Sequence, residues 1–335
     1  MNRQRLRSLI AASGPILSAV LLIGISVSYG GRFDVLAALT VFPVWIWLVP
    51  GLILVATGFA RPNRRWMTVV AVGWLVCLFG FADEPWSLLR LATGPDTPTA
   101  SETVIRVASL NCDIGNLNAL NELAAVGADV ILLQESPGRE SLEKFGQKLF
   151  GEETGLVTGV DASILVRGQV VPVPLSANQR AFFVEARARL HSGVEVEIIS
   201  TRLVPAVFRL DLWSVDCWRE QSENRRKRRE QVREIARRIE AIPVEIPLIL
   251  GGDFNAPQGD AVFRLLEPRL HETFRERGYG WGNTILNSLP VLRIDQVWTT
   301  RTIRASRVVA RQTRHSDHRM VVADLIVACS SSSQK

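Results

Sequence analysis

The sequence predicts a mixed α/β domain in which two β-sheets pack face to face under covering helices, preceded by an N-terminal region of membrane helices. Three observations favour this fold class. Short apolar segments alternate with amphipathic ones from residue 104 onward, polar residues follow several of those apolar segments, and the first quarter of the chain contains long uncharged runs. The 47% hydrophobic content of the 335 residues therefore averages two unlike parts.

Three uncharged runs in residues 1–91 predict transmembrane helices at residues 9–29, 35–60 and 66–82. They contain 21, 26 and 17 residues, and a helix needs about 20 residues to cross a bilayer. Because the third run is at the lower limit, a re-entrant or interfacial segment is the alternative there. A cleaved signal peptide is the alternative for residues 1–29, since a basic start and small residues near position 28 permit it.

The placement of arginine predicts the orientation of these helices. Basic residues precede the first run and fill the second connection: Arg3, Arg5, Arg7, Arg61, Arg64 and Arg65. Short loops rich in Lys and Arg stay in the cytoplasm. Three crossings of the cytoplasmic (inner) membrane would then place the rest of the chain on its outer or periplasmic side. If the third run does not cross, the placement inverts.

The composition of the following residues predicts the boundaries of the soluble part. Residues 92–103 are small, polar and proline-rich, as in a linker. A globular domain is expected over residues 104–328, which is long enough for one sizeable core. Residues 329–335 are too polar to pack and are predicted to be a disordered tail.

Within residues 104–328, strands and helices are predicted from their hydrophobic periods. Residues 117–124 have helical spacing until Gly127, and Val130 to Leu133 is a buried strand directly before Glu135. Residues 182–190 and 194–198 alternate as an antiparallel hairpin with one buried face. Further strands are expected at residues 104–110, 246–250, 291–298 and 319–327.

Polar motifs stand at the ends of these segments in a specific order. They are Asn111 in SLNCD, Glu135 in LLQES, Asp253 and Asn255 in GGDFN, Asp295 in RIDQVW, and Asp317 with His318 in SDHRMV. In combination the motifs resemble a membrane-anchored, bacterial-type member of the endonuclease/exonuclease/phosphatase superfamily, whose members have a pancreatic-deoxyribonuclease-like fold. The resemblance implies a four-layer α/β/β/α sandwich and hydrolysis of phosphoesters with a divalent metal, usually Mg²⁺, with Mn²⁺ as a possible substitute.

The resemblance also implies roles that the chemistry of the side chains supports. Glu135 would be a direct metal ligand, because a carboxylate is a hard oxygen donor, and Asn111 and Asp317 would complete the metal shell or its second layer. An Asx turn is the alternative use of Asn111, and a solvated surface acid is the alternative for Glu135. Catalysis would fall to four further residues: Asp253, Asn255, His318 and Asp295.

Each catalytic residue has a specific expected task. Asp253 would orient and deprotonate the attacking water, and Asn255 would hold the water or a phosphate oxygen. A tight turn is the structural alternative for GGDFN, although the segment can form a turn and carry catalytic residues at the same time. His318 would donate to a non-bridging oxygen, with Asp295 keeping its imidazole protonated. By contrast, His191, His271 and His315 are expected to be structural.

Position 202 departs from the family pattern. Many members have a Thr-His pair where this chain has Thr201 and Arg202. Arginine cannot act as an acid or base near neutral pH, but it can clamp a phosphate. Arg202 is therefore expected to bind substrate together with Asn255. The substitution also raises the possibility of weakened turnover.

Residues 219–240 are predicted to form an amphipathic helix with many basic residues. Its charged face would contact anionic phosphate, either of nucleic acid or of lipid headgroups, or would simply be a solvated face of Glu and Arg pairs. The four cysteines lack a metal-ligand spacing, so no zinc site is expected; a disulfide between Cys112 and Cys217 is allowed but not required.

The sequence thus predicts a membrane-anchored, metal-dependent phosphoesterase that cleaves phosphodiesters by in-line attack of water, in the manner of a nuclease or of a phospholipase or sphingomyelinase. Its expected partners are the lipid bilayer and a phosphate ester, which would be nucleic acid, a phospholipid headgroup or a small phosphodiester. No obligate protein partner is evident. The alternative is a membrane-tethered binding protein on the same fold whose catalysis is weakened.

Overall fold

The structure is a computed structural model that describes residues 3–58, 65–207 and 209–328, with side chains from residue 13 onward. The end of the second predicted span, Arg61, Arg64, Cys329 and the predicted tail lie outside the described residues. The chain divides into two compact units. One comprises Met1–Trp86, Val207–Arg225 and Gly259–Ala261, and the other comprises Ser87–Ala206, Arg226–Gln258 and Val262–Lys335.

The first unit is built from apolar helices around Trp74. The helices and short 3₁₀ turn are α1 (Arg3–Gly31), η1 (Asp34–Leu36), α2 (Ala37–Thr40), α3 (Val44–Thr57) and α4 (Arg65–Phe81). The indole nitrogen of Trp74 donates to Ser18 Oγ at 2.9 Å, and that hydroxyl donates to the carbonyl of Gly51 at 2.8 Å. These bonds satisfy polar groups inside an otherwise apolar cluster.

One helix of this unit is long and apolar enough to cross a membrane, over Ser13–Gly31. Two further spans are reached only if each bent helix pair counts as one, with bends of 73° after α2 and 80° after α4. Several large apolar side chains of α1 are exposed: Ile16, Val20, Ile23 and Val27. Exposed apolar side chains along a helix of this length are typical of a surface that faces lipid.

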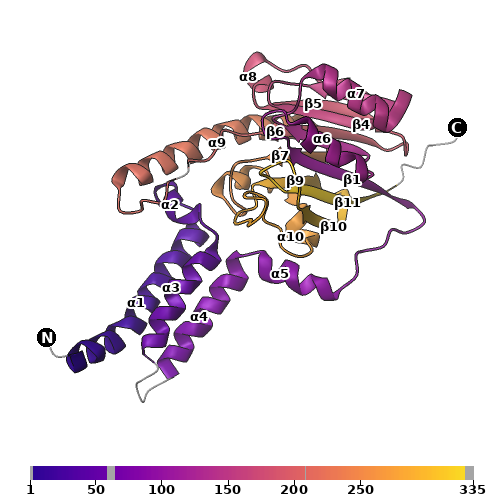
Figure 1. Cartoon of the computed structure of the whole chain (residues 1–335). Helices are drawn as coiled ribbons and strands as arrows, with labels where there is room; N and C mark the ends of the chain where they lie inside the picture. The colour runs from indigo at the N-terminus through magenta and orange to yellow at the C-terminus, as the bar shows by residue number, and fades with distance from the viewer. Residues whose placement is uncertain (1–2, 59–64, 208, 329–335) are drawn as a thin grey trace. The chain divides into compact units, whose positions relative to one another are not determined.

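The second unit contains the strands (Figure 1). They are β1 (Glu102–Asn111), β2 (Val130–Gln134), β3 (Thr154–Thr158), β4 (Ala162–Pro172), β5 (Phe183–Leu190), β6 (Glu195–Arg202), β7 (Leu248–Asp253), β8 (Leu270–Glu272), β9 (Asp295–Thr300), β10 (Ile303–Arg311) and β11 (Met320–Ala328). The remaining helical elements are α5 (Glu84–Leu89), η2 (Arg90–Ala92), α6 (Leu117–Glu122), η3 (Leu123–Ala125), α7 (Arg139–Phe150), η4 (Gly151–Glu153), α8 (Ala177–Arg180), α9 (Val215–Ala241), η5 (Ala261–Leu265) and α10 (Thr273–Arg277). Helices α5, α9 and η5 extend across the boundary between the units.

The strands form one curled mixed sheet in the order β10-β11-β1-β2-β4-β5-β6-β7-β9-β8, with β3 paired to β4. Strand β4 pairs with β2 through its first half and with β5 through its second half. Gly168 lies at this change of partner with φ of +150°, and a Cβ there would be 2.3 Å from the carbonyl oxygen of Arg189. Only glycine allows that approach, so the sheet can fold over at this position.

Three apolar clusters separate the layers. One joins inward-facing residues of both halves of the sheet, including Ile105, Ile164, Ile198 and Val297. The second packs α9 against β6 and β7, and the third packs α6 and α7 against β1 and β2. The prediction of an α/β fold with helices over two packed sheet layers is therefore confirmed, with the difference that the two layers are continuous through β4.

Two parallel strand pairs place the polar motifs at one edge. β1 runs parallel to β2, and β6 runs parallel to β7. Carboxyl ends of parallel strands meet at the same edge, so Asn111 and the residue after β2 lie together, as do Arg202 and Asp253. Antiparallel β9 begins at this edge with Asp295 directly opposite Asp253.

The hairpin of β5 and β6 and the strand that delivers Glu135 are confirmed by the strand pairing. The strand expected from residue 291 begins only at Asp295, because residues 285–292 form a bridge and turn instead. Sequence reasoning did not identify β3, β4, β10 or α7. In β4, exposed and glycine positions interrupt the hydrophobic alternation after residue 166, which removes the signal that predicts a strand.

Candidate active site

The GGDFN segment ends β7 and holds Asp253 in a defined position. Gly252 has φ of +142°, and a Cβ there would be 1.9 Å from the carbonyl oxygen of Thr201 on β6. Asp253 Oδ1 accepts from the backbone amide of Asn255 at 2.9 Å, and Oδ2 accepts from the Asn255 side-chain amide at 3.1 Å. Asn255 itself has φ of +48°. The glycine and the left-handed asparagine therefore both serve to place this carboxylate.

The carboxyl group of Asp253 is buried at the strand edge, with 1% exposure. Burial is the larger cause and the nearby carboxylate of Asp295 the second cause that raise its pKa to about 6. Hydrogen bonds from Asn255 and Asn111 act in the opposite direction. The pKa of Asp253 therefore lies only slightly below neutral pH.

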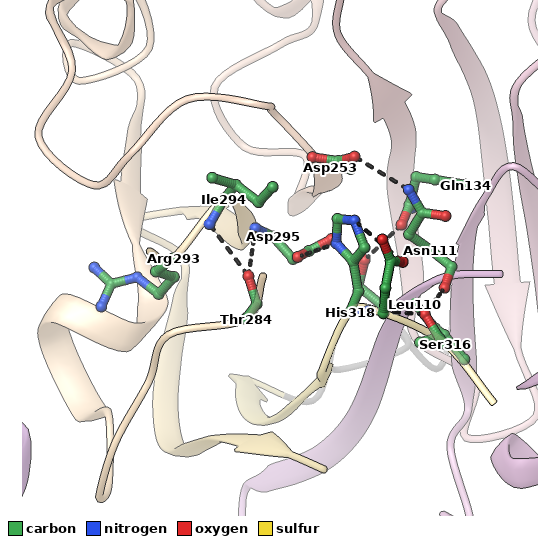
Figure 2. Close-up of polar contacts among 12 residues, drawn as sticks. Leu110, Asn111, Gln134, Asp253, Thr284, Arg293, Ile294, Asp295, Ser316 and His318 are labelled. Carbon is green, nitrogen blue, oxygen red and sulfur yellow. Dashed lines mark hydrogen bonds and ion pairs between the residues drawn. The ribbon is translucent and has the colours of Figure 1, made fainter. Parts of the chain in front are cut away.

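His318 and Asp295 form a buried ion pair beside Asp253. His318 Nδ1 lies 2.8 Å from Asp295 Oδ2, as Figure 2 shows. Burial of the imidazole disfavours its charged form, but the Asp295 carboxylate outweighs that effect and raises the pKa of His318 to about 10. The imidazole is therefore held as a cation.

Backbone contacts fix both partners of this ion pair. Thr284 Oγ1 accepts from the amides of Ile294 and Asp295 at 3.2 Å. Ser316 Oγ accepts from the His318 amide at 3.0 Å and donates to the carbonyl of Asn111 at 2.8 Å, which joins the SDH segment to β1. The ring and the carboxylate are thus positioned before any substrate binds.

Glu135 follows β2 directly and has φ of +44°, a strained conformation for this residue type. Its Oε2 accepts from the amide of Ile114 at 2.9 Å, and its Oε1 accepts from Asn111 Nδ2 at 3.1 Å. Burial raises the carboxyl pKa, but these hydrogen bonds and the charge of Arg202 outweigh burial and hold the pKa below its usual range. The ionised form of Glu135 is therefore favoured.

Asn111 connects the two carboxylates. Its Nδ2 donates to Glu135 Oε1 and, at 3.2 Å, to Asp253 Oδ2, while its Oδ1 accepts from the amide of Asp113 at 3.0 Å. Figure 2 shows Asn111, at the end of β1, directed at Asp253 at the end of β7. The Asx turn considered for Asn111 is therefore present together with a bridging contact inside the site.

Arg202 does not extend freely from the end of β6. Its NH2 nitrogen lies 2.8 Å from Glu135 Oε1, and its NH1 nitrogen lies 3.2 Å from Asp161 Oδ2. Asp161 precedes β4, and its carbonyl oxygen accepts from the amide of Glu135 at 2.8 Å. Sequence reasoning did not identify Asp161, because a single acid in a turn carries no motif.

Asp317 lies at the rim of the cluster. Its side chain is 61% exposed, and its Oδ1 is 3.8 Å from His318 Nε2. The other histidines pair with glutamates: His191 with Glu153, His271 with Glu276 and His315 with Glu122. The structure thus brings the eight predicted site residues to one edge of the sheet and leaves these three histidines in separate ion pairs.

A divalent cation has two candidate positions here. Ligand atoms of Asp253, Asp295 and His318 all lie within 4.8 Å of one another, so this group could hold a metal. However, the Asp295 carboxylate favours the protonated form of His318, and a protonated imidazole has no lone pair for a metal. Glu135 has an ionised carboxylate at the same edge and fits a hard cation better.

The basic residues of α9 have several different environments. Within the first unit, Arg225 is buried and its Nε bonds to Asp260 at 3.1 Å. Within the second unit, Arg238 makes two hydrogen bonds, of 2.8 and 3.0 Å, to the buried carboxylate of Glu185. Arg226 and Lys227 are exposed. Part of the basic segment is therefore committed to internal ion pairs.

The thiols of Cys112 and Cys217 are both buried and free.

The residues before β1 contact the strand unit: Arg90 donates to the carbonyl of Arg275 at 2.7 Å, and Tyr279 donates from its hydroxyl to the carbonyl of Gly94 at 2.7 Å. Asp96 pairs with Arg277 at 2.7 Å. Tyr279 therefore packs against the segment before β1.

Comparisons with known proteins agree with the fold described above. The chain resembles a solved endonuclease/exonuclease/phosphatase family protein of Bacteroides thetaiotaomicron with 14% identity and a TM-score of 0.51, over 68% of this chain and 98% of that one. A solved endonuclease/exonuclease/phosphatase from Bacteroides vulgatus gives 13% identity and a TM-score of 0.51, over 67% of this chain and 98% of that one. One from Beutenbergia cavernae gives 16% and 0.50, over 67% and 72%. At these identities the likeness shows the fold.

No curated protein matches the sequence closely enough to count as a relative. The model of the Endonuclease/Exonuclease/phosphatase family matches residues 107–318, from the middle of β1 to His318. Members of that family are hydrolases that act on phosphoester bonds. Since the match covers most of the chain and includes every motif of the site, this protein belongs to the endonuclease/exonuclease/phosphatase family.

Proposed function

We propose that this protein is a membrane-anchored, divalent-metal-dependent phosphoesterase that hydrolyses phosphodiester bonds by in-line attack of water. The observation that carries the proposal is the pairing, at one sheet edge, of a buried carboxylate that can take a proton with a buried imidazolium that can give one. Hydrolysis of a phosphoester needs both, because a proton leaves the water while negative charge builds on the phosphoryl group.

Asp253 is the proposed base. Its carboxylate is held by Asn255 and Asn111, so only a limited part of its surface is open to a water. A pKa of about 6 leaves it ionised at neutral pH, yet basic enough to accept the proton of an attacking water. Asn255 lies beside it, bonded to the carbonyl of Leu203 at 3.0 Å, and would orient that water or a phosphate oxygen.

His318 is the proposed electrophilic partner. Because Asp295 occupies Nδ1, the second ring nitrogen carries the proton that can be donated to a non-bridging oxygen. Asp295 acts through His318, so it is a positioning residue. This assignment explains why the imidazolium is buried with a carboxylate and not exposed to solvent.

Mg²⁺, or Mn²⁺ in its place, is the proposed cofactor. Glu135 would bind it directly, and Asn111 and Asp317 would complete its surroundings as ligands or through water. The donor set fits a hard divalent cation, since it consists of oxygen atoms from carboxylates and one amide. When bound, the ion would supply positive charge to the phosphoryl oxygens. Arg202 would add a guanidinium that binds the phosphate.

Membrane anchoring is supported by the apolar helix at Ser13–Gly31. The arginine pattern supports an inner-membrane protein whose catalytic unit lies on the outer or periplasmic side. A phosphodiester in nucleic acid, in a phospholipid headgroup or in a small molecule is the proposed substrate. Each of these presents the same phosphoryl group to the site.

The test uses the full chain purified in detergent and assayed on bis-p-nitrophenyl phosphate, DNA, RNA, sphingomyelin and phosphoinositides. Turnover of at least one substrate is expected with Mg²⁺ and is expected to disappear with EDTA. Asp253→Ala should lower kcat by about 10² to 10⁴ fold, whereas His191→Ala, in a separate ion pair, should leave it unchanged.

Equal rates for wild type and Asp253→Ala would refute the catalytic assignment. Binding of a phosphodiester without release of product from any substrate would favour the alternative of a tethered binding protein. The ion pair between Arg202 and Glu135 is the observation that keeps that alternative in the test.

A further inference from the structure

The guanidinium of Arg202 is paired with the carboxylate of Glu135, the residue that the proposed function assigns as the metal ligand. Its NH2 nitrogen is 2.8 Å from Glu135 Oε1, an oxygen that also accepts from Asn111. Oε2 is bonded to the Ile114 amide. A carboxylate offers about four acceptor positions in total. A divalent cation that binds Oε1 therefore meets a guanidinium already in contact with that oxygen.

A second acid gives Arg202 a place to move. Asp161 Oδ2 is 3.2 Å from NH1, and the Asp161 side chain is 42% exposed while that of Arg202 is 20% exposed. Because the backbone of Asp161 is bonded to the amide of Glu135, the two acids stay adjacent. Arg202 can release Glu135 and keep one carboxylate partner, so displacement does not leave an unpaired charge.

The third donor of the guanidinium points to an anion. Among the residues that the structure describes, Arg202 Nε is buried and has no hydrogen-bond partner. A buried donor without an acceptor is costly. Arg202 also lies directly opposite Asp253 in the parallel pairing of β6 and β7. A phosphate oxygen bound beside Asp253 would therefore lie at the end of the strand next to the one that carries Arg202.

We infer that the guanidinium of Arg202 moves between two anionic partners. It neutralises Glu135 in the resting site, and a divalent cation that binds Glu135 displaces it toward the substrate phosphate. This inference rests on the proposed function, because it uses Glu135 as the metal ligand. It makes metal and phosphate binding cooperative through this chain's own arginine. The affinity for metal is lower when phosphate is absent and higher when phosphate is bound.

This exchange predicts opposite effects on Mn²⁺ affinity for two substitutions that each replace a charged side chain by an uncharged one. Arg202→Gln removes the competing cation, so Mn²⁺ should bind at least about fivefold more tightly, the lower end of couplings between sites. Asp161→Asn removes the second partner, so Arg202 is held more firmly on Glu135 and Mn²⁺ should bind more weakly. Arg167→Gln breaks an exposed ion pair with Glu153 and serves as the matched control with no change.

The measurement is Mn²⁺ binding to the full chain in detergent, read from the electron paramagnetic resonance signal of free Mn²⁺, with and without inorganic phosphate. In wild type, phosphate should tighten Mn²⁺ binding, and in Arg202→Gln that tightening should shrink by about fivefold or more. Thermal unfolding of each variant shows whether it is folded. Arg202→Lys, which keeps the charge, gives a second reading if Arg202→Gln is unfolded, and should bind Mn²⁺ with nearly wild-type affinity.

Glu135→Gln separates the failure of this inference from failure of the proposed function. If Glu135→Gln leaves Mn²⁺ affinity unchanged, Glu135 is not the metal ligand and both ideas fall. If Glu135→Gln weakens Mn²⁺ binding while Arg202→Gln fails to tighten it, the metal site stands and the exchange is wrong. The exchange is also overturned if Asp161→Asn tightens Mn²⁺ binding, or if phosphate coupling is the same in wild type and Arg202→Gln.

Discussion

At the scale of single residues, the protonation states of Asp253 and His318 determine the pH range in which the proposed chemistry can run. Asp253 must be deprotonated to accept a proton, so activity should rise as pH increases through about 6. His318 must be protonated to donate, so activity should fall as pH increases through about 10. A bound cation would lower both pKa values, because positive charge favours the deprotonated form of each group.

The substitution Asp295→Asn should move both limbs of the pH profile of kcat/KM to lower pH. Loss of the carboxylate removes the main force that keeps His318 protonated and also removes a negative charge that raises the pKa of Asp253. Activity at the new optimum should fall by about 10² fold or more. His315→Gln, which disturbs a histidine paired with Glu122, should leave the profile in place. A fixed alkaline limb in Asp295→Asn would show that it does not report on His318.

The eight predicted site residues were recognisable from sequence because each stands at one end of an apolar segment. What sequence could not provide was the partner of Arg202. Asp161 lies in a turn before β4, and β4 itself was not predicted, so nothing connected position 161 with position 202. The contact exists because the curled sheet brings the turn before β4 next to the end of β6, and tertiary folding of that kind leaves no local pattern.

At the scale of strands, the close approach of β6 and β7 depends on Gly252. In Gly252→Ala the new Cβ would meet the carbonyl oxygen of Thr201 at 1.9 Å, at a φ of +142°. We expect a loss of about 2 to 3 kcal/mol in the free energy of unfolding. Urea denaturation followed by circular dichroism measures it. Gly138→Ala is the matched control, because that glycine has φ of −58° and no atom within 4 Å of the added Cβ.

Helix α9 is attached to the sheet by charge as well as by its apolar side. Arg238→Met leaves the Glu185 carboxylate, whose side chain is 1% exposed, without its cation and next to Glu197. The expected loss is about 3 kcal/mol, the lower end for breaking a buried pair, since Arg238 is partly exposed. Arg237→Met, which breaks an exposed pair with Glu234, should cost less than about 0.5 kcal/mol. Equal losses would mean that the Arg238 pair is no more important than a surface contact.

The amphipathic helix over residues 219–240 was predicted from its apolar stripe, and its extent is close to that of α9. Its basic residues could not be assigned from sequence, because a charged face has the same pattern whether it meets solvent, phosphate or a buried carboxylate. Glu185 is an alternating position in a strand and reads as exposed. It is buried because α9 covers that face of the sheet and supplies Arg238.

At the scale of the whole molecule, the composition of the first 91 residues identified an apolar region, and the family motifs identified the catalytic unit. The number of crossings is harder to read, because α4 is 17 residues long and the chain bends by 80° after it. A 17-residue helix is about 25 Å long, slightly shorter than a hydrocarbon core of about 30 Å. The predicted sidedness therefore depends on whether the bent pair of α2 and α3 crosses and on whether α4 crosses.

A reporter at the carboxyl terminus tests that dependence directly. With three crossings and the arginine-rich end inside, alkaline phosphatase fused after Lys335 should be active on the outer side, and a green fluorescent protein fusion should stay dark. Deleting residues 66–82 should reverse both signals, because an even number of crossings returns the terminus to the side where the chain began. Replacing Arg3, Arg5 and Arg7 with Gln should weaken the preference without removing a span. If the full-length fusion fluoresces and the deletion leaves it fluorescent, α4 does not cross and the catalytic unit lies on the cytoplasmic side.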